Sequence, residues 1–439
     1  MALLEILINI GGVLLLLTSW VKLDFGWAYA IILTLIVLQL FLTPWRWQML
    51  PFYMAFLGMF AAFYWQFDVH IIIKLVGFVF AFLLTLLSVF LSHYMPLIKL
   101  SKPTGHYDIG TVSAAYERRD GDEVRHLFAK IWYPASGEYG HYKRDGIWSE
   151  FYKNEKFPAV VRYLALYLKN IKTHSYIEMP FLTAKKPYPV IIYNHALISI
   201  AADNNRLLEG LASRGYVVLS VRHEEQDVEY KRIQAGLSDA EKAMDKQLLS
   251  ILAKDEISQE KRAELTLQQI QNSSGMAGIV MRRAADSQFM LDKLGELLGR
   301  VGAVDENVID LQNVGAIGLS VGGGVATELG RTDNRIKAVV NLDGGVFSAT
   351  PLALINVPYL MMYSEFNNGS MDFLEPVTHA GFETHMIAGA QHLNYHDVGS
   401  LLPIMKFMGA VGKISGEEVF TQSTQIVVEF FAKYMPPSE

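Results

Sequence analysis

The first hundred residues carry four long apolar segments separated by short polar breaks. They cover residues 3–20, 27–42, 52–65 and 71–91. A helix needs about 20 apolar residues to cross a bilayer, and the third segment would need its flanks to do so. Tryptophans mark several segment ends, which is typical of the headgroup layer. The pattern predicts a four-helix transmembrane region over residues 1–95, and a cluster of buried helices in a soluble protein is the alternative.

The rest of the chain alternates short β-rich runs with helical patterns. The runs lie at 126–133, 188–194, 216–222, 314–319, 338–342 and 359–363, with an edge strand expected at 108–116. Helical periodicity appears at 204–214, 277–298, 321–332 and 417–434. Such alternation is typical of parallel strands joined by crossover helices. We therefore predict an α/β domain over residues 96–439, with a mostly parallel sheet and helices on both faces.

Two segments depart from that alternation. Residues 229–274 are polar and helical, and the run from Ser238 to Glu241 fits a capping box. This insertion is interpreted as a helical lid, with a solvated helical hairpin as the alternative. Residues 157–171 mix apolar and basic side chains. They predict either a helix at the lipid interface or a helix packed on the domain.

Charge adds three observations to this picture. The first hundred residues hold seven charged side chains, which leaves 75 of the chain's 82 for the other 339 residues. The net charge of −6 argues against a nucleic-acid-binding protein. Three basic residues near segment ends lie on the membrane side that the C-terminal domain would share, and two lie on the other side, which favours a cytoplasmic C-terminal domain. The three are Arg46, Lys99 and Lys102, and the two are Lys22 and Lys74.

Residue types also limit the chemistry. The chain has no cysteine, which excludes disulfides, thiolate metal sites and cysteine nucleophiles. No metal-ligand spacing and no dinucleotide or phosphate-binding glycine loop is found. We therefore expect neither a metal nor a cofactor.

A nucleophile elbow is predicted around Ser320. The β-rich run 314–319 leads into Gly318-Leu-Ser-Val-Gly322, and a helical pattern follows. In such an elbow the serine occupies a strained turn, and small residues two positions away let strand and helix approach. The next amide, that of Val321, lies at a helix N-terminus and can bind an oxyanion. A glycine-rich packing turn is the alternative interpretation.

A serine nucleophile needs a base, and the base needs an orienting acid. Asp343 follows the next strand along the chain, and Glu365 follows the one after. Both are candidate acids. Of the four histidines that follow, His392 lies in a loop after the expected last strand, as a mobile base would. His385 is expected inside a strand, and His396 in a surface or hydrogen-bonding role.

The second oxyanion donor is expected in the loop after residues 188–194. The backbone N–H of Leu197 or Ala196 is the candidate. We expect Asn194 and His195 to support this loop, and His223 to be a structural histidine.

These motifs resemble the platelet-activating-factor acetylhydrolase family of serine α/β-hydrolases, within the dienelactone hydrolase and lipase-like superfamily. The similarity extends over residues 101 to about 435 and rests on seven segments. They are Ile171-Lys-Thr-His-Ser-Tyr176, Tyr193-Asn-His-Ala-Leu197, Gly215–His223, Arg283–Asp292, Gly318–Gly323 and Gly389-Ala-Gln-His392-Leu-Asn394, together with Leu342-Asp343-Gly. The resemblance implies an α/β-hydrolase fold. It implies Ser320 as nucleophile, Asp343 rather than Glu365 as acid, His392 as base, and the N–H groups of Leu197 and Val321 as the oxyanion hole.

The resemblance further implies a phospholipase-like esterase that acts on short or oxidised acyl esters of phospholipids, and the four apolar segments predict that it is anchored in a membrane. Its expected partners are a lipid or other amphipathic ester and the bilayer, in a multi-pass protein of the cell membrane. Three alternatives remain: an acyltransferase with the same triad, a non-catalytic membrane scaffold, and a transporter. The transporter is disfavoured because the four segments lack central polar groups. The sequence leaves the acyl length, the headgroup and the oligomeric state open.

Overall fold

The computed structural model describes residues 3–18, 26–65, 70–150, 159–197, 199–223, 242, 243, 246, 257–303 and 306–437. The chain divides into two compact units. The helical unit comprises residues 1–100, 151–172 and 402–408, and the sheet unit comprises the remainder. The helical unit therefore contains two segments, 151–172 and 402–408, that the sequence-based division at residue 95 placed in the other domain.

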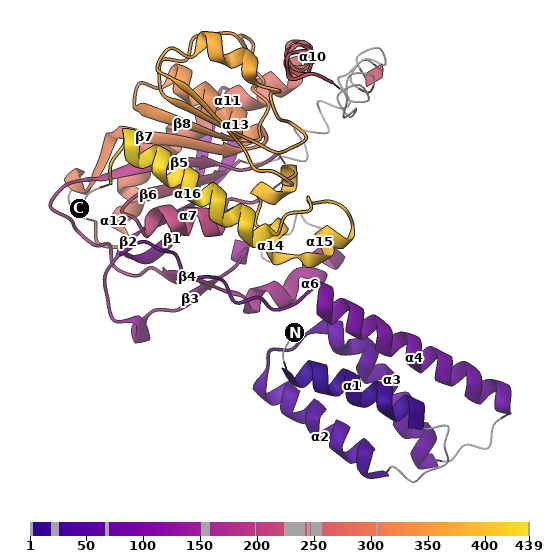
Figure 1. The fold of residues 1–439 in the computed structure, drawn as a ribbon. Helices are drawn as coiled ribbons and strands as arrows, with labels where there is room; N and C mark the ends of the chain where they lie inside the picture. The colour runs from indigo at the N-terminus through magenta and orange to yellow at the C-terminus, as the bar shows by residue number, and fades with distance from the viewer. Residues whose placement is uncertain are drawn as a thin grey trace. The chain divides into compact units, whose positions relative to one another are not determined.

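Each of the four apolar segments is a helix (Figure 1). They are α1 (Leu3–Thr18), α2 (Gly26–Leu42), α3 (Leu50–Trp65) and α4 (Ile71–Tyr94), with a 3-10 turn, η1 (Trp47–Met49), before α3. Within the described chain, α4 alone is long and apolar enough to cross a membrane, with 24 residues and a mean hydropathy of 2.5. The other three are shorter, so the four predicted membrane spans are not confirmed.

Two charged residues of the helical unit neutralise each other in its interior. Arg46 Nη1 lies 2.6 Å from Glu5 Oε2, and both side chains are 1% exposed. The guanidinium also donates to the carbonyl oxygen of Met95. Because a buried charge is tolerated only when paired and hydrogen-bonded, this contact accounts for an acid and a base in so apolar a region.

Two later segments pack onto these helices. Trp47 Nε1 donates to the carbonyl oxygen of Leu164 at 2.8 Å, from α6 (Ala159–Ala165). The Phe407 ring, at the end of α15 (Pro403–Phe407), lies 5.2 Å from the Phe90 ring. A 3-10 turn, η3 (Leu166–Asn170), follows α6. The stretch 157–171 thus contains a helix packed on its own unit, and these contacts explain why the unit extends beyond residue 100.

The sheet unit is built on ten strands in the order β10-β9-β8-β7-β5-β6-β2-β1-β4-β3. The pairs from β5 to β10 are parallel, and β2 runs antiparallel to β1 and β6. The strands are β1 (Asp108–Asp120), β2 (Glu123–Ala135), β3 (Arg144–Gly146), β4 (Lys172–Ile177), β5 (Tyr188–Asn194), β6 (Val217–Arg222), β7 (Ile309–Leu319), β8 (Ile336–Leu342), β9 (Tyr359–Tyr363) and β10 (Phe382–Met386). The predicted mostly parallel sheet is confirmed.

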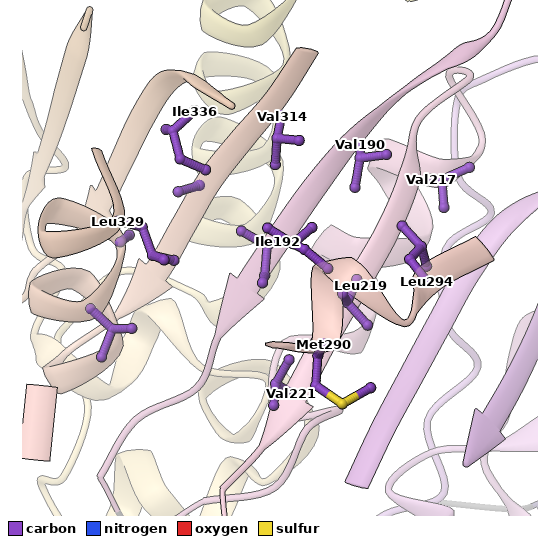
Figure 2. Packing of buried hydrophobic residues seen from close by; sticks show 14 of the residues in the cluster. Val190, Ile192, Val217, Leu219, Val221, Met290, Leu294, Val314, Leu329 and Ile336 are labelled. Atoms are coloured by element: carbon purple, nitrogen blue, oxygen red, sulfur yellow. The ribbon is translucent and has the colours of Figure 1, made fainter. Parts of the chain in front are cut away.

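Helices cover both faces of this sheet. Alternate residues of its strands point to opposite faces, and both sets are apolar, so both faces need to be buried. Val190 and Ile192 of β5 pack with Met290 and Leu294, as Figure 2 shows. Ile191 and Tyr193 belong to the core on the other face. The first face carries α11 (Ser274–Asp292), α12 (Leu294–Gly299) and α13 (Val321–Thr332), and the second carries α7 (Asn205–Ala212) and α16 (Gly416–Tyr434). The architecture is that expected of an α/β hydrolase.

The predicted insertion at 229–274 is described in part. Its C-terminal portion forms α10 (Gln259–Gln271), capped by the Ser258 side chain, which accepts from the Lys261 N–H. The capping box predicted at Ser238 lies outside the described residues. The remaining elements are η2 (Tyr139–His141), η4 (Glu306–Val308), η5 (Asp372–Val377), η6 (His392–Tyr395) and α14 (Val398–Leu401).

Candidate active site

Ser320 occupies the turn between β7 and α13, and its backbone is strained. Its φ is 59°, a left-handed conformation that a serine rarely adopts. A Cβ added at Gly318 would lie 1.9 Å from the Gly322 carbonyl oxygen. Strand and helix therefore approach as closely as the predicted elbow requires, and only glycine fits there.

Asp343 and His392 meet at the carboxyl edge of the sheet. Asp343 comes directly after β8, and His392 begins η6. The His392 Nδ1 atom lies 2.7 Å from Asp343 Oδ2, a distance at which a ring N–H donates to a carboxylate. The carboxylate is fully buried, whereas the imidazole is 41% exposed. An acid in this arrangement orients the ring and fixes its tautomer.

The Asp343 carboxylate is held by two further donors. The Ser364 N–H donates to Oδ1 at 2.6 Å, and Asn367 Nδ2 donates to Oδ2 at 2.8 Å. Glu365, the rival acid, is exposed, and its carboxylate accepts from the Gly389 N–H at 3.1 Å. The structure thus brings Asp343, and not Glu365, to His392.

A cavity of about 190 Å³ lies at this edge of the sheet. Its lining includes Ser320, Asp343 and His392. The remaining lining comes from α10, from the turn after β8 and from the loop after β9. An ester carbonyl bound here would lie against both the serine and the histidine.

The predicted oxyanion residues lie on two segments that touch. Leu197 follows β5, and Val321 is the first residue of α13. A Cβ added at Gly322 would lie 2.0 Å from the Asn194 carbonyl oxygen, so the start of the helix packs directly on the end of β5.

Arg283 of α11 supports the loop after β5 from within the core. It is fully buried, and its Nη2 donates to the Leu197 carbonyl oxygen at 2.9 Å. Its Nη1 lies 3.4 Å from the His195 carbonyl oxygen. Arg283 thereby fixes the peptide carbonyls on both sides of Ala196, close to the proposed oxyanion hole.

His195 and His223 form a buried pair with ring centroids 5.5 Å apart. Burial lowers the pKa of His223 to about 4, although its hydrogen bond to Asp286 opposes the shift. Burial, followed by the charge of Arg283, lowers the pKa of His195 well below its ordinary value. Burial therefore favours the neutral form of both rings, which is compatible with the supporting role expected of them.

The other candidate histidines do not line the cavity. His385 is an exposed residue of β10, and His379 is exposed before that strand. His396 Nε2 is hydrogen-bonded to Ser199 Oγ at 3.2 Å, and burial lowers the pKa of His396 to about 3. Across the described segments, no group of three His, Asp or Glu side chains is arranged to hold a metal ion.

Sequence reasoning missed three residues around the site: Arg262, Arg283 and Asn367. Arg283 begins one of the segments that carried the family resemblance, yet nothing in that segment indicated its contact with a loop 86 residues away. Asn367 follows a strand end at the carboxyl edge of the sheet, where ligands of α/β proteins bind, so its position was a usable signal. Arg262 belongs to the insertion, and only the fold shows which side of α10 faces the cavity.

Comparison with known proteins places this site in a family. The family described as platelet-activating factor acetylhydrolase, isoform II, matches residues 94–437. No curated protein sequence matches the chain. A ferulic acid esterase from Streptomyces cinnamoneus is 19% identical, with a TM-score of 0.54, over 77% of this chain and 93% of that one. A dienelactone hydrolase-like promiscuous phosphotriesterase from metagenomic libraries is 12% identical, with a TM-score of 0.38, over 73% and 99%. The first similarity shows the α/β-hydrolase fold, and the family match shows that the chain belongs to the platelet-activating factor acetylhydrolase, isoform II, family of ester hydrolases.

Proposed function

We propose that this chain is a membrane-anchored carboxylic ester hydrolase that works through Ser320, His392 and Asp343. The observation that carries the proposal is the 2.7 Å contact between His392 and Asp343 beside a cavity that Ser320 also lines. The strained φ of Ser320 supports it, because such strain gathers at functional turns.

The proposed reaction has two halves. His392 takes the proton of the Ser320 hydroxyl as its oxygen attacks the ester carbonyl, and the N–H groups of Leu197 and Val321 stabilise the resulting oxyanion. The intermediate collapses to an acyl-serine, and His392 gives the proton to the departing alcohol. Water then attacks the acyl-serine with His392 again as base, which releases the carboxylic acid and restores the hydroxyl.

The substrate we propose is a short or oxidised acyl ester of a glycerophospholipid. The cavity of about 190 Å³ is small beside the roughly 300–1,000 Å³ of ligand pockets in general, which favours a short acyl chain. Ile270, Phe347 and Met371 give it an apolar wall. The match to the platelet-activating factor acetylhydrolase family supports the phospholipid part of the proposal.

Hydrolysis and acyl transfer are distinguished by their products. We expect the purified full-length chain to release one free carboxylic acid for each alcohol from p-nitrophenyl butyrate and from dibutyryl phosphatidylcholine. Addition of a lysophospholipid as acyl acceptor should leave that ratio at one, measured by mass spectrometry of acids and lipids. Acylated acceptor in place of free acid would identify a transferase instead.

The membrane anchor is proposed for residues 1–100. Most of the large apolar side chains that are exposed in the described chain belong to α1–α4, among them Phe41, Phe80 and Leu83. Exposed apolar surface on this scale marks an interaction with a membrane or a partner. The helix α4 has the length to span a bilayer. The cytoplasmic side for the sheet unit stays a prediction.

The anchor is tested by extraction. We expect the full-length chain to stay in the membrane pellet after washing with alkaline carbonate and to leave it only in detergent. Phe80→Lys with Leu83→Lys should weaken this retention, because each buried charge costs about 2.5–3.5 kcal/mol at the centre of a spanning helix. Lys261→Gln, on the sheet unit, serves as the control. Release of the unaltered chain by carbonate alone would overturn the anchor.

A further inference from the structure

The loop between β9 and η5 contributes a buried serine to the wall of the cavity. Ser370 lines the cavity together with the proposed nucleophile Ser320, and it is 6% exposed. Its backbone N–H donates to the Asn367 carbonyl oxygen at 2.9 Å, whereas its hydroxyl makes no hydrogen bond within the described segments. A buried hydroxyl without a protein partner costs free energy unless another group bonds to it. A substrate in the cavity is placed to supply that group.

Ser370 differs from three other polar side chains of this lining. The Thr266 hydroxyl donates to a backbone carbonyl oxygen one turn earlier in α10, at 2.8 Å. The Asn367 amide nitrogen donates to Asp343 Oδ2 at 2.8 Å. Gln269 is only half-buried, so solvent reaches it. Ser370 can therefore bond to a substrate without giving up a contact within the described chain.

The loop holds Ser370 in place from both sides. After it, the Met371 N–H donates to Tyr363 Oη at 3.0 Å, and that hydroxyl donates to Asp372 Oδ1 at 2.8 Å. Before it, Asn367 is tied to the acid of the triad. A group that is already ordered loses little freedom when a ligand binds, so its hydrogen bond can contribute to selectivity.

The chemistry of this wall suits a neutral oxygen on a short ester. A serine hydroxyl is uncharged and can donate to a ketone or a hydroxyl oxygen. Ile270, Phe347 and Met371 add apolar surface for the hydrocarbon part of the ester. The cavity of about 190 Å³ is small, so one short ester can contact both Ser320 and Ser370.

We propose that the Ser370 hydroxyl binds a neutral oxygen of the substrate and selects esters that carry such an oxygen over apolar esters of the same shape. This inference rests on the proposed ester hydrolysis and adds a specificity-determining residue. The oxygen belongs either to an oxidised acyl chain or to the alcohol part of the ester. Both sources present the same chemistry to the hydroxyl, and the test separates them.

The test uses two pairs of esters matched in shape. The first compares p-nitrophenyl 4-oxopentanoate with p-nitrophenyl 4-methylpentanoate, which exchanges a ketone oxygen for a methyl group on the acyl chain. The second compares 2-hydroxyethyl butyrate with propyl butyrate, which exchanges a hydroxyl for a methyl group on the alcohol. For each pair, kcat/KM of the oxygen-bearing ester is divided by that of its apolar partner. Full-length wild type, Ser370→Ala, Ser370→Thr and Ser423→Ala are compared, so the intrinsic reactivity of each ester cancels.

In at least one pair, Ser370→Ala should lower the ratio by about threefold to tenfold, the effect of losing one neutral hydrogen bond. Its kcat/KM for the apolar ester should stay level or rise, because that ester no longer buries an unpaired hydroxyl. Ser370→Thr keeps the hydroxyl and should keep most of the ratio. Ser423→Ala, whose hydroxyl donates to Phe420 within α16, should match wild type. A fall in the first pair identifies the acyl chain as the source of the oxygen, and a fall in the second identifies the alcohol.

Four results would overturn the proposal. One is a Ser370→Ala variant that matches wild type on all four esters. Another is an equal fall for both members of each pair, which would assign Ser370 to holding the loop. The third is a ratio that Ser370→Thr lowers as far as Ser370→Ala, which would make size and not the hydroxyl decisive. The last is a wild type that hydrolyses none of the four esters. That result would refute the proposed ester hydrolysis as well, whereas the first three would leave it standing.

Discussion

Replacing Ser320 with alanine should abolish ester turnover and leave the fold intact. Loss of a serine nucleophile lowers kcat by about 10⁵- to 10⁶-fold, because no acyl-serine can form and only direct attack by water, assisted by the oxyanion donors, remains. The fold is expected to survive, since an alanine at this turn keeps the Cβ that already sits at a φ of 59° and loses only the hydroxyl. Hydrolysis of p-nitrophenyl butyrate and covalent labelling by a fluorophosphonate probe measure the effect.

The matched control is Ser423→Ala on α16. Its hydroxyl donates to the Phe420 carbonyl oxygen within that helix, away from the cavity. This variant should label and turn over like wild type, and both variants should melt within a few degrees of it. Turnover retained in Ser320→Ala would move the nucleophile elsewhere. A wild-type Ser320 that resists the probe would favour a non-catalytic scaffold.

Much of the sheet unit follows from local pattern. The structure reproduces the predicted bounds of β5 and β9 at 188–194 and 359–363, and those of α13 at 321–332. The two strands are buried, so their apolar runs are nearly continuous, and each ends in a polar turn. The candidates for the triad could also be found from the sequence, because they follow strand ends in a known chain order.

Other features depend on distant contacts. The strand β4 is polar and pairs in parallel with β1, more than sixty residues earlier, so its own sequence carries little strand signal. The segments 151–172 and 402–408 join the helical unit through aromatic contacts such as that of Phe407 with Tyr94. The cavity face of α10 is set by packing against the loop at Gly369. Periodicity identifies such a helix but not the partner to which it turns.

The second large effect on activity is expected from substituting the acid that orients His392, for which Asp343 and Glu365 are the candidates. Asp343→Asn should lower kcat/KM for p-nitrophenyl butyrate by about 10⁴-fold, because a neutral amide neither stabilises the imidazolium nor holds the ring in the productive tautomer. Glu365→Gln should stay within about threefold of wild type, because that exposed carboxylate only accepts a backbone N–H.

The aspartate substitution is well suited to this comparison. Asp343 has a φ of 55°, and asparagine is among the few residues that tolerate this conformation. The side-chain oxygen of the introduced amide can still accept from the Ser364 N–H, a hydrogen bond that the aspartate makes at 2.6 Å. The backbone should therefore keep its course, and unchanged thermal melting would confirm that the loss is chemical. If Glu365→Gln were instead the damaging change, the base would be oriented from the next strand, and the 2.7 Å contact of His392 with Asp343 would have no part in catalysis.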